Sequence, residues 1–77
     1  MGPIQLRELI FNTLLNRDKA DAIGVVDIEF ELDDLYNQMV SLTGLPKEAI
    51  ESVLLRQYPE WLRKNHPNEP IPPDQNP

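Results

Sequence analysis

The residues best suited to chemistry are carboxylates gathered near the middle of the chain. They are Asp27, Glu29, Glu31, Asp33 and Asp34. Carboxylate oxygens are ligands for hard cations such as Mg²⁺ or Ca²⁺, so a metal or catalytic site is the first hypothesis to weigh. The spacing is not that of a calcium-binding loop, and no nucleophile or histidine accompanies these acids. A solvated polar face is therefore the interpretation we favour for these acids, and a docking surface for a basic protein partner is the next. We expect no metal, cofactor or catalytic residue.

Size and composition narrow the class of protein. The chain has 77 residues, a net charge of −6, one histidine (His66) and no cysteine, which excludes disulfides and thiolate metal sites. It has no apolar run long enough to cross a membrane, and we expect no signal peptide at its start. We expect a soluble, intracellular, cytoplasmic protein with one domain over residues 1–65. Residues 66–77 are rich in proline and should form a flexible tail.

The first element predicted is an amphipathic helix over residues 4–20. Leu6, Ile10 and Leu14 follow the spacing of a helix with one buried face. Pro3 suits the start of this helix, because its missing N–H would have no partner there in any case.

The apolar period changes over residues 25–32. Val26, Ile28, Phe30 and Leu32 alternate with acidic residues, which predicts a strand with one buried face. A lone strand must find a partner for its backbone groups. We expect a homodimer that pairs this strand with its copy. Pairing with the tail, pairing with another protein, or an extended loop are the alternatives.

A second and a third helix should follow around a tight turn. Asp33 or Asp34 can cap a helix that runs to about Thr43. Gly44 can adopt the positive φ that ends it, and Pro46 can open the next helix.

Proline should interrupt this last helix, because Pro59 cannot donate a backbone hydrogen bond. We expect a stop or kink near Gln57 and then a short turn that places Trp61 on the core. Trp61 and Tyr58 are also candidate interface anchors, since these residue types are enriched at binding hot spots. Core packing is the interpretation we favour.

The bihelical segment around Gly44 resembles a helix-turn-helix unit. The apolar positions of that family are filled here by Met39, Leu45, Ile50 and Val53. The order of elements over residues 4–57 is similar to a winged helix-turn-helix domain that lacks its wing. A second resemblance is to the ribbon-helix-helix fold, whose paired strands would satisfy the lone strand.

These resemblances imply DNA binding through a recognition helix. The residues matched to it are Lys47, Glu48, Glu51, Ser52, Leu55 and Arg56. Affinity for DNA comes mainly from cations that neutralise phosphates, and this set is too acidic for that role. DNA binding is therefore the alternative that charge disfavours.

The prediction as a whole is a mainly α fold of three to four helices with one short strand and a helix-turn-helix-like core. Its expected role is that of a non-enzymatic regulator or adaptor. It would act through protein–protein interaction at the acidic surface, as a homodimer joined through residues 25–32. A DNA-binding transcriptional regulator is the alternative.

Overall fold

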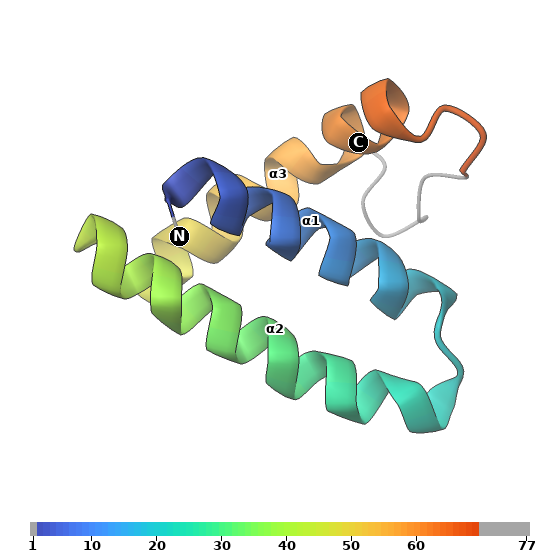
Figure 1. Cartoon of the computed structure of the whole chain (residues 1–77), viewed down its shortest axis with the longest axis horizontal. Helices are drawn as coiled ribbons and strands as arrows, with labels where there is room; N and C mark the ends of the chain where they lie inside the picture. The colour runs from blue at the N-terminus through green and yellow to red at the C-terminus, as the bar shows by residue number, and fades with distance from the viewer. Residues whose placement is uncertain (1, 70–77) are drawn as a thin grey trace.

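Three helices make up the part of the chain that the structure describes. A computed structural model describes residues 2–69, apart from the side chains of residues 22 and 23. The helices are α1 (Pro3–Lys19), α2 (Ala22–Thr43) and α3 (Lys47–Asn65). Helices α1 and α2 lie side by side and antiparallel, and α3 crosses behind α1 (Figure 1). The mainly helical fold class is confirmed.

Helix α1 agrees with its prediction from sequence. Pro3 occupies the start of the helix, and Leu6, Ile10 and Leu14 are buried on one face. Arg17 and Lys19 lie in the last turn, where cations stabilise the negative end of the helix dipole. The helix therefore carries both an apolar stripe toward the core and favourable charge at its end.

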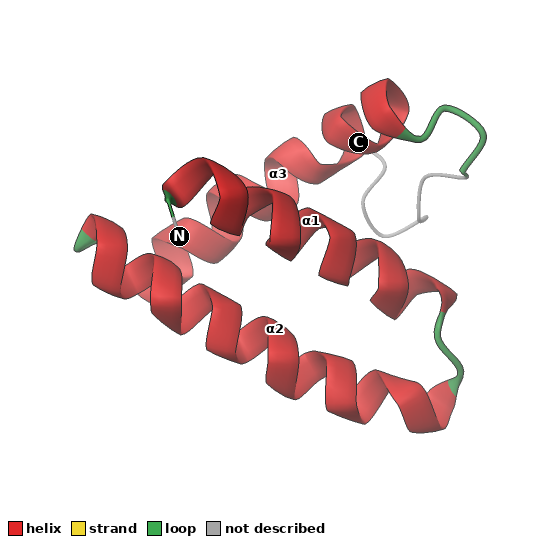
Figure 2. Cartoon of the chain, in the orientation of Figure 1, coloured by secondary structure: helices red, strands yellow, loops and turns green. Residues whose placement is uncertain are grey.

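The predicted strand at residues 25–32 is wrong, because these residues belong to α2 (Figure 2). Asp21 caps the helix: its side chain accepts a hydrogen bond of 2.9 Å from the Gly24 N–H. Each turn then satisfies its own backbone groups, so the segment needs no partner strand. The argument for a homodimer paired through residues 25–32 is lost with the strand.

The expected buried face of that strand is also split by the helical rotation. Leu32 is buried, but Val26 and Phe30 are exposed. Residues that alternate in sequence lie about 200° apart around a helix, so they cannot share one face. The same continuous helix shows that Asp33 and Asp34 do not act as caps, because both lie in its interior.

The turn after α2 forms as the sequence predicts. Gly44 has φ 73° and its N–H bonds to the Val40 carbonyl, which ends the helix after Thr43. This left-handed conformation costs a residue with a side chain about 1–2 kcal/mol, whereas glycine adopts it freely. Pro46 precedes the first residue of α3 and fixes an extended entry to the helix.

Helix α3 continues through Pro59, contrary to the predicted stop near Gln57. A proline inside a helix costs about 3 kcal/mol, because it removes a hydrogen bond and crowds the preceding turn. Three large side chains on the two turns around it, Tyr58, Trp61 and Leu62, are buried in the core. Each such burial contributes about 1.5–3 kcal/mol, which exceeds the cost of the proline.

The core is built from one face of each helix. Its members are Leu6, Ile10, Phe11, Leu14, Leu15, Leu32, Leu35, Tyr36, Met39, Ile50, Leu54, Tyr58, Trp61 and Leu62. Two side-chain hydrogen bonds at the edge of the core connect α3 to α1. The Tyr58 hydroxyl donates to Asp18 at 2.9 Å, and the Trp61 Nε1–H donates to Glu8 at 3.0 Å. After α3 the chain turns, and Glu69 forms an ion pair with Lys19 at 2.6 Å. Most of the predicted tail, residues 70–77, lies outside the described residues.

Replacing the two interior glycines with alanine should change stability in opposite directions. Gly44→Ala should lower the free energy of unfolding by about 1–2 kcal/mol, because alanine must adopt a left-handed φ. No atom lies within 4 Å of the added methyl group, so crowding would not be the cause. Gly24→Ala should be neutral or stabilising by up to about 1 kcal/mol, because that residue is helical. Urea denaturation of both variants tests this; equal destabilisation would contradict the assignment of the turn.

Candidate functional site

The acidic residues singled out from the sequence separate onto different sides of α2. Glu29 forms an ion pair with Arg17 of α1 at 3.3 Å, and Asp33 forms one with Lys47 of α3. Asp27, Glu31 and Asp34 fall within about 60° of one another on the other side of the helix. The five carboxylates therefore do not form one surface: two help to hold the helices together and three project into solvent.

The solvent side of α2 also carries exposed apolar side chains. Phe30 is 73% exposed and Val26, one turn earlier, is 57% exposed. Helical rotation places Phe30 opposite buried Met39, and Val26 opposite buried Leu35, because nine residues make about two and a half turns. We call Val26, Asp27, Phe30, Glu31 and Asp34 the outer face of α2. It is an apolar strip with a carboxylate border.

The carboxylates of the outer face are not neutralised within the described part of the chain. No cation among residues 2–69 forms an ion pair with Asp27, Glu31 or Asp34. Asp34 accepts a hydrogen bond of 3.0 Å from the Gln38 side chain, one turn along the same helix. The outer face consequently keeps its negative charge, and a cationic ligand could approach it without displacing an internal partner.

The residues matched to a recognition helix differ in their surroundings. Lys47 is paired with Asp33, so its charge is already balanced. Glu51 and Leu55 face α2 and line a cavity of about 130 Å³ beside Tyr36. Four of the six are exposed along α3: Glu48, Ser52, Leu55 and Arg56. Arg56 is the one cation in this exposed group.

The two aromatic residues proposed as interface anchors lie in the core. Tyr58 is fully buried and Trp61 is nearly so. Their rings pack against Phe11 of α1: the Phe11–Trp61 centroids are 5.2 Å apart and the Phe11–Tyr58 centroids 6.1 Å. The core packing that the sequence favoured for these residues is confirmed.

A small apolar groove lies between the end of α2 and the start of α3. Its volume is about 180 Å³, and its lining is Met39, Thr43, Leu45, Ala49, Ile50, Val53 and Leu54. Of the four positions matched to a helix-turn-helix unit, Met39 and Ile50 are buried, whereas Leu45 and Val53 are exposed. Both family resemblances also took residues 25–32 as a strand, and the helix found there lends them no support.

Two tyrosines have strongly perturbed titration. Burial and the nearby Glu51 carboxylate raise the pKa of Tyr36 to about 12. Burial and the hydrogen bond to Asp18 raise the pKa of Tyr58 as well. The environments differ in one respect. The Tyr58 hydroxyl has an acceptor, whereas the Tyr36 hydroxyl is buried with no hydrogen-bond partner among the described residues.

Sequence reasoning found the acids of the outer face but assigned Phe30 to a buried strand. A count at about 100° per residue would have placed Phe30 opposite Met39, so the signal was present in the helical period. Among residues 2–69, no group of three or more His, Cys, Asp or Glu side chains is placed to hold a metal ion. None of the helices in this range is long and apolar enough to span a membrane.

Comparison with known proteins adds no relationship. The chain matches no protein family, no curated protein and no solved structure. The argument for function therefore rests on the surfaces described above.

The two tyrosines should respond oppositely to replacement by phenylalanine. Tyr36→Phe should raise the free energy of unfolding by about 1 kcal/mol, because it removes a buried hydroxyl that lacks a partner. Tyr58→Phe should lower it by about 1.5–3 kcal/mol, because the hydrogen bond to the Asp18 carboxylate is lost. Urea titrations at neutral pH measure both changes. Equal losses in the two variants would contradict the difference in hydrogen bonding.

Stability should also fall at alkaline pH. Both tyrosines have a native pKa above the ordinary value of 10.0. Below pH 10 the hydroxyls are protonated in both the native and the unfolded state, so their contribution to the free energy of unfolding is complete. Above pH 10 the unfolded chain loses these protons first, and stability declines until the raised native pKa is passed. Unfolding curves between pH 8 and pH 12 test this, and Tyr36→Phe should flatten the decline.

Proposed function

We propose that this protein is a non-enzymatic regulator or adaptor that binds a protein partner through the outer face of α2. The partner segment would present cationic side chains around an apolar side chain that covers Phe30. The single observation that carries this proposal is the position of Phe30. It is the most exposed large apolar side chain among those described, and it lies beside carboxylates that lack internal partners.

The energetics of Phe30 support a role in binding. The side chain projects away from the core, so the fold gains little from a phenylalanine at this position. Burying a phenylalanine side chain completely contributes about 1.5–3 kcal/mol to the free energy of binding. Aromatic residues of this kind supply much of the binding energy at many interfaces. A partner would therefore gain affinity from Phe30 without any rearrangement of the three helices.

The charge of the outer face supports a basic partner. Asp27, Glu31 and Asp34 lie along one edge of the apolar strip, and the chain as a whole carries a net charge of −6. Such a field accelerates the approach of cations and repels acidic proteins. A solvated polar face is the simpler interpretation of three exposed acids, but it gives no reason for the exposed phenylalanine beside them.

The DNA-binding alternative has less support. Lys47 is paired with Asp33, and the exposed residues of the proposed recognition helix combine Arg56 with Glu48. We expect a labelled 20-base-pair duplex to show no change in fluorescence anisotropy with this protein at 50 mM salt. Binding that weakens steeply with added salt would reveal phosphate contacts, and DNA binding would then be the favoured function.

Photo-crosslinking at position 30 tests the proposed interface. Benzoylphenylalanine in place of Phe30 keeps an aromatic side chain and should yield a discrete protein adduct in cells that express the protein. The same group in place of exposed Ser52 on α3 is the matched control and should not give that adduct.

Charge variants of the crosslinking protein test whether the partner is basic. Asp27→Asn, Glu31→Gln and Asp34→Asn together should reduce the adduct at least about tenfold, since each close charge pair contributes roughly 1 kcal/mol. Glu48→Gln with Glu60→Gln removes exposed acids elsewhere and should leave it unchanged. Identical adducts from positions 30 and 52 would contradict the proposal.

A further inference from the structure

The apolar groove between the end of α2 and the start of α3 is suited to receive a side chain from outside the chain. Thr43 is the one polar residue in its lining, and its hydroxyl is already engaged. It donates to the Met39 carbonyl at 2.8 Å and accepts from the Leu45 N–H at 3.3 Å. An apolar cavity of about 150 Å³ can hold a benzene molecule. At about 180 Å³ the groove therefore has room for one apolar side chain.

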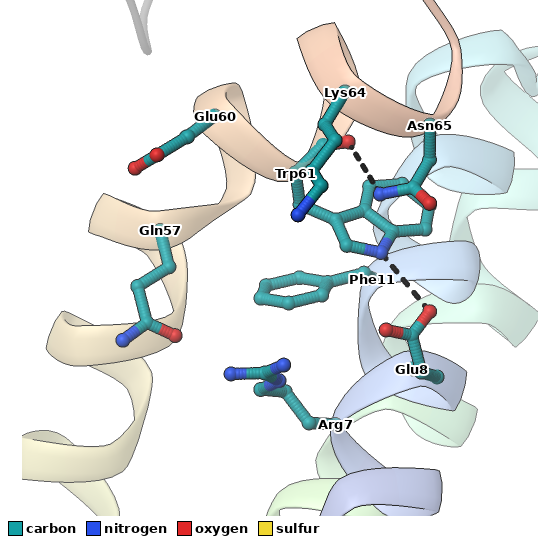
Figure 3. A pocket seen from close by; sticks show the side chains of 8 residues that line it. All are labelled: Arg7, Glu8, Phe11, Gln57, Glu60, Trp61, Lys64 and Asn65. Carbon is teal, nitrogen blue, oxygen red and sulfur yellow. Dashed lines mark hydrogen bonds between the residues drawn. The ribbon is translucent and has the colours of Figure 1, made fainter.

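A larger hollow between α1 and α3, of about 400 Å³, lacks this character (Figure 3). Its aromatic residues, Phe11 and Trp61, are buried in the core and present no free ring face. Its two cations share the space with Glu8 and Glu60, so the charges of the hollow balance. Of these two hollows, the apolar groove is the one that an incoming side chain can enter.

The exposed side of α3 continues from this groove. Ala49, Ser52, Val53 and Arg56 are exposed and follow the i, i+3, i+4, i+7 spacing, so they form one stripe along the helix. We call these four residues the α3 seam. Ala49 and Val53 also line the groove, and Val53 is 40% exposed at its rim. Ala49 and Ser52 are small, which allows a second helix to approach closely.

The charges on this side of α3 are balanced and have no internal partners. Glu48 and Arg56 are both exposed, and neither forms an ion pair within residues 2–69. One lies four residues before Ser52 and the other four residues after it. An antiparallel copy of α3 centred on Ser52 would therefore bring each Glu48 level with the Arg56 of the other copy.

The same arrangement fills the groove. Val53 lies one residue beyond this centre, so the Val53 of one copy comes level with the part of the other copy's groove between Ala49 and Val53. The aliphatic stem of Arg56 would cross Ala49 and bring its charged end toward Glu48. A surface with this property is complementary to itself, as a two-fold interface requires.

From these observations we propose that two copies of this chain form a two-fold dimer through the α3 seam, with the two α3 helices antiparallel and the axis near Ser52. Val53 of each copy enters the apolar groove of the other, and two Glu48–Arg56 ion pairs border the contact. Charge favours a second copy as the occupant. Glu48 and Arg56 cancel in a chain of net charge −6, whereas the outer face of α2 would oppose its own carboxylates. The dimer does not depend on the binding proposed for that outer face.

Analytical ultracentrifugation of the purified full chain tests dimer formation. The contact is small, as in weak transient complexes, so we expect a dissociation constant on the order of 100 µM. Sedimentation equilibrium between about 10 µM and about 1 mM should show the mass rise from one chain toward two. Benzoylphenylalanine at position 52 would join two copies of this chain, a product that differs in mass from the adduct at position 30. A mass of one chain at the highest concentration would overturn the proposal.

Exchange of the two charges tests the antiparallel arrangement. Glu48→Arg alone brings cations level with each other and should weaken the dimer at least about tenfold, as should Arg56→Glu alone, which opposes carboxylates. The double variant restores opposite charges and should return the dissociation constant to within about threefold of the original. A double variant that dimerises no more tightly than the single variants would overturn the proposal, because only a direct contact lets one change reverse the other.

Val53→Asp tests the apolar contact. The side chain is exposed in a single copy, so the fold is kept, with circular dichroism as the check. In the dimer the carboxylate would be buried in the groove of the other copy, so this variant should remain monomeric up to about 1 mM. Phe30→Ser removes an exposed apolar side chain from α2 and is the matched control, which should dimerise as the unchanged protein does. Equal effects of the two variants would overturn the assignment of the interface to α3.

Discussion

The contact between the aromatic residues of α3 and Phe11 of α1 is the interaction on which the rest of the structure depends. Tyr58 and Trp61 lie on either side of Pro59, and their burial holds the helix together at the residue least suited to it. Hydrogen bonds from Tyr58 to Asp18 and from Trp61 to Glu8 fix the orientation of the two rings. Without this contact α3 would end near Tyr58, because Pro59 locally disfavours a continuous helix.

Much of this fold could be predicted from residues whose effect is local. Pro3, Gly44 and Pro46 act through their own φ angles, so their consequences can be derived without knowledge of the tertiary structure. Pro59 could not be judged in the same way. The hydrogen bond lost at Pro59 is a local cost, but the packing that offsets this cost involves α1, which is distant in the sequence.

Residues 25–32 show a different failure of sequence reasoning. Their alternation is that of a strand, yet the Asp21 cap before them and the buried Leu35 and Met39 after them make one continuous helix more favourable. The predicted site was partly wrong for the same reason. The five acids were predicted to form one surface, but the helix separates Glu29, which pairs with Arg17, from the carboxylates that face solvent.

The division of α2 into a side that contacts the other helices and a side that faces solvent has an evolutionary consequence. Substitutions at Leu35 or Met39 must preserve the packing of the core, so most of them reduce stability. Substitutions at Phe30 or Glu31 leave the core and both ion pairs of α2 unchanged. The two sides can therefore be selected independently, and the outer face of α2 can change in sequence while stability stays above the threshold for folding.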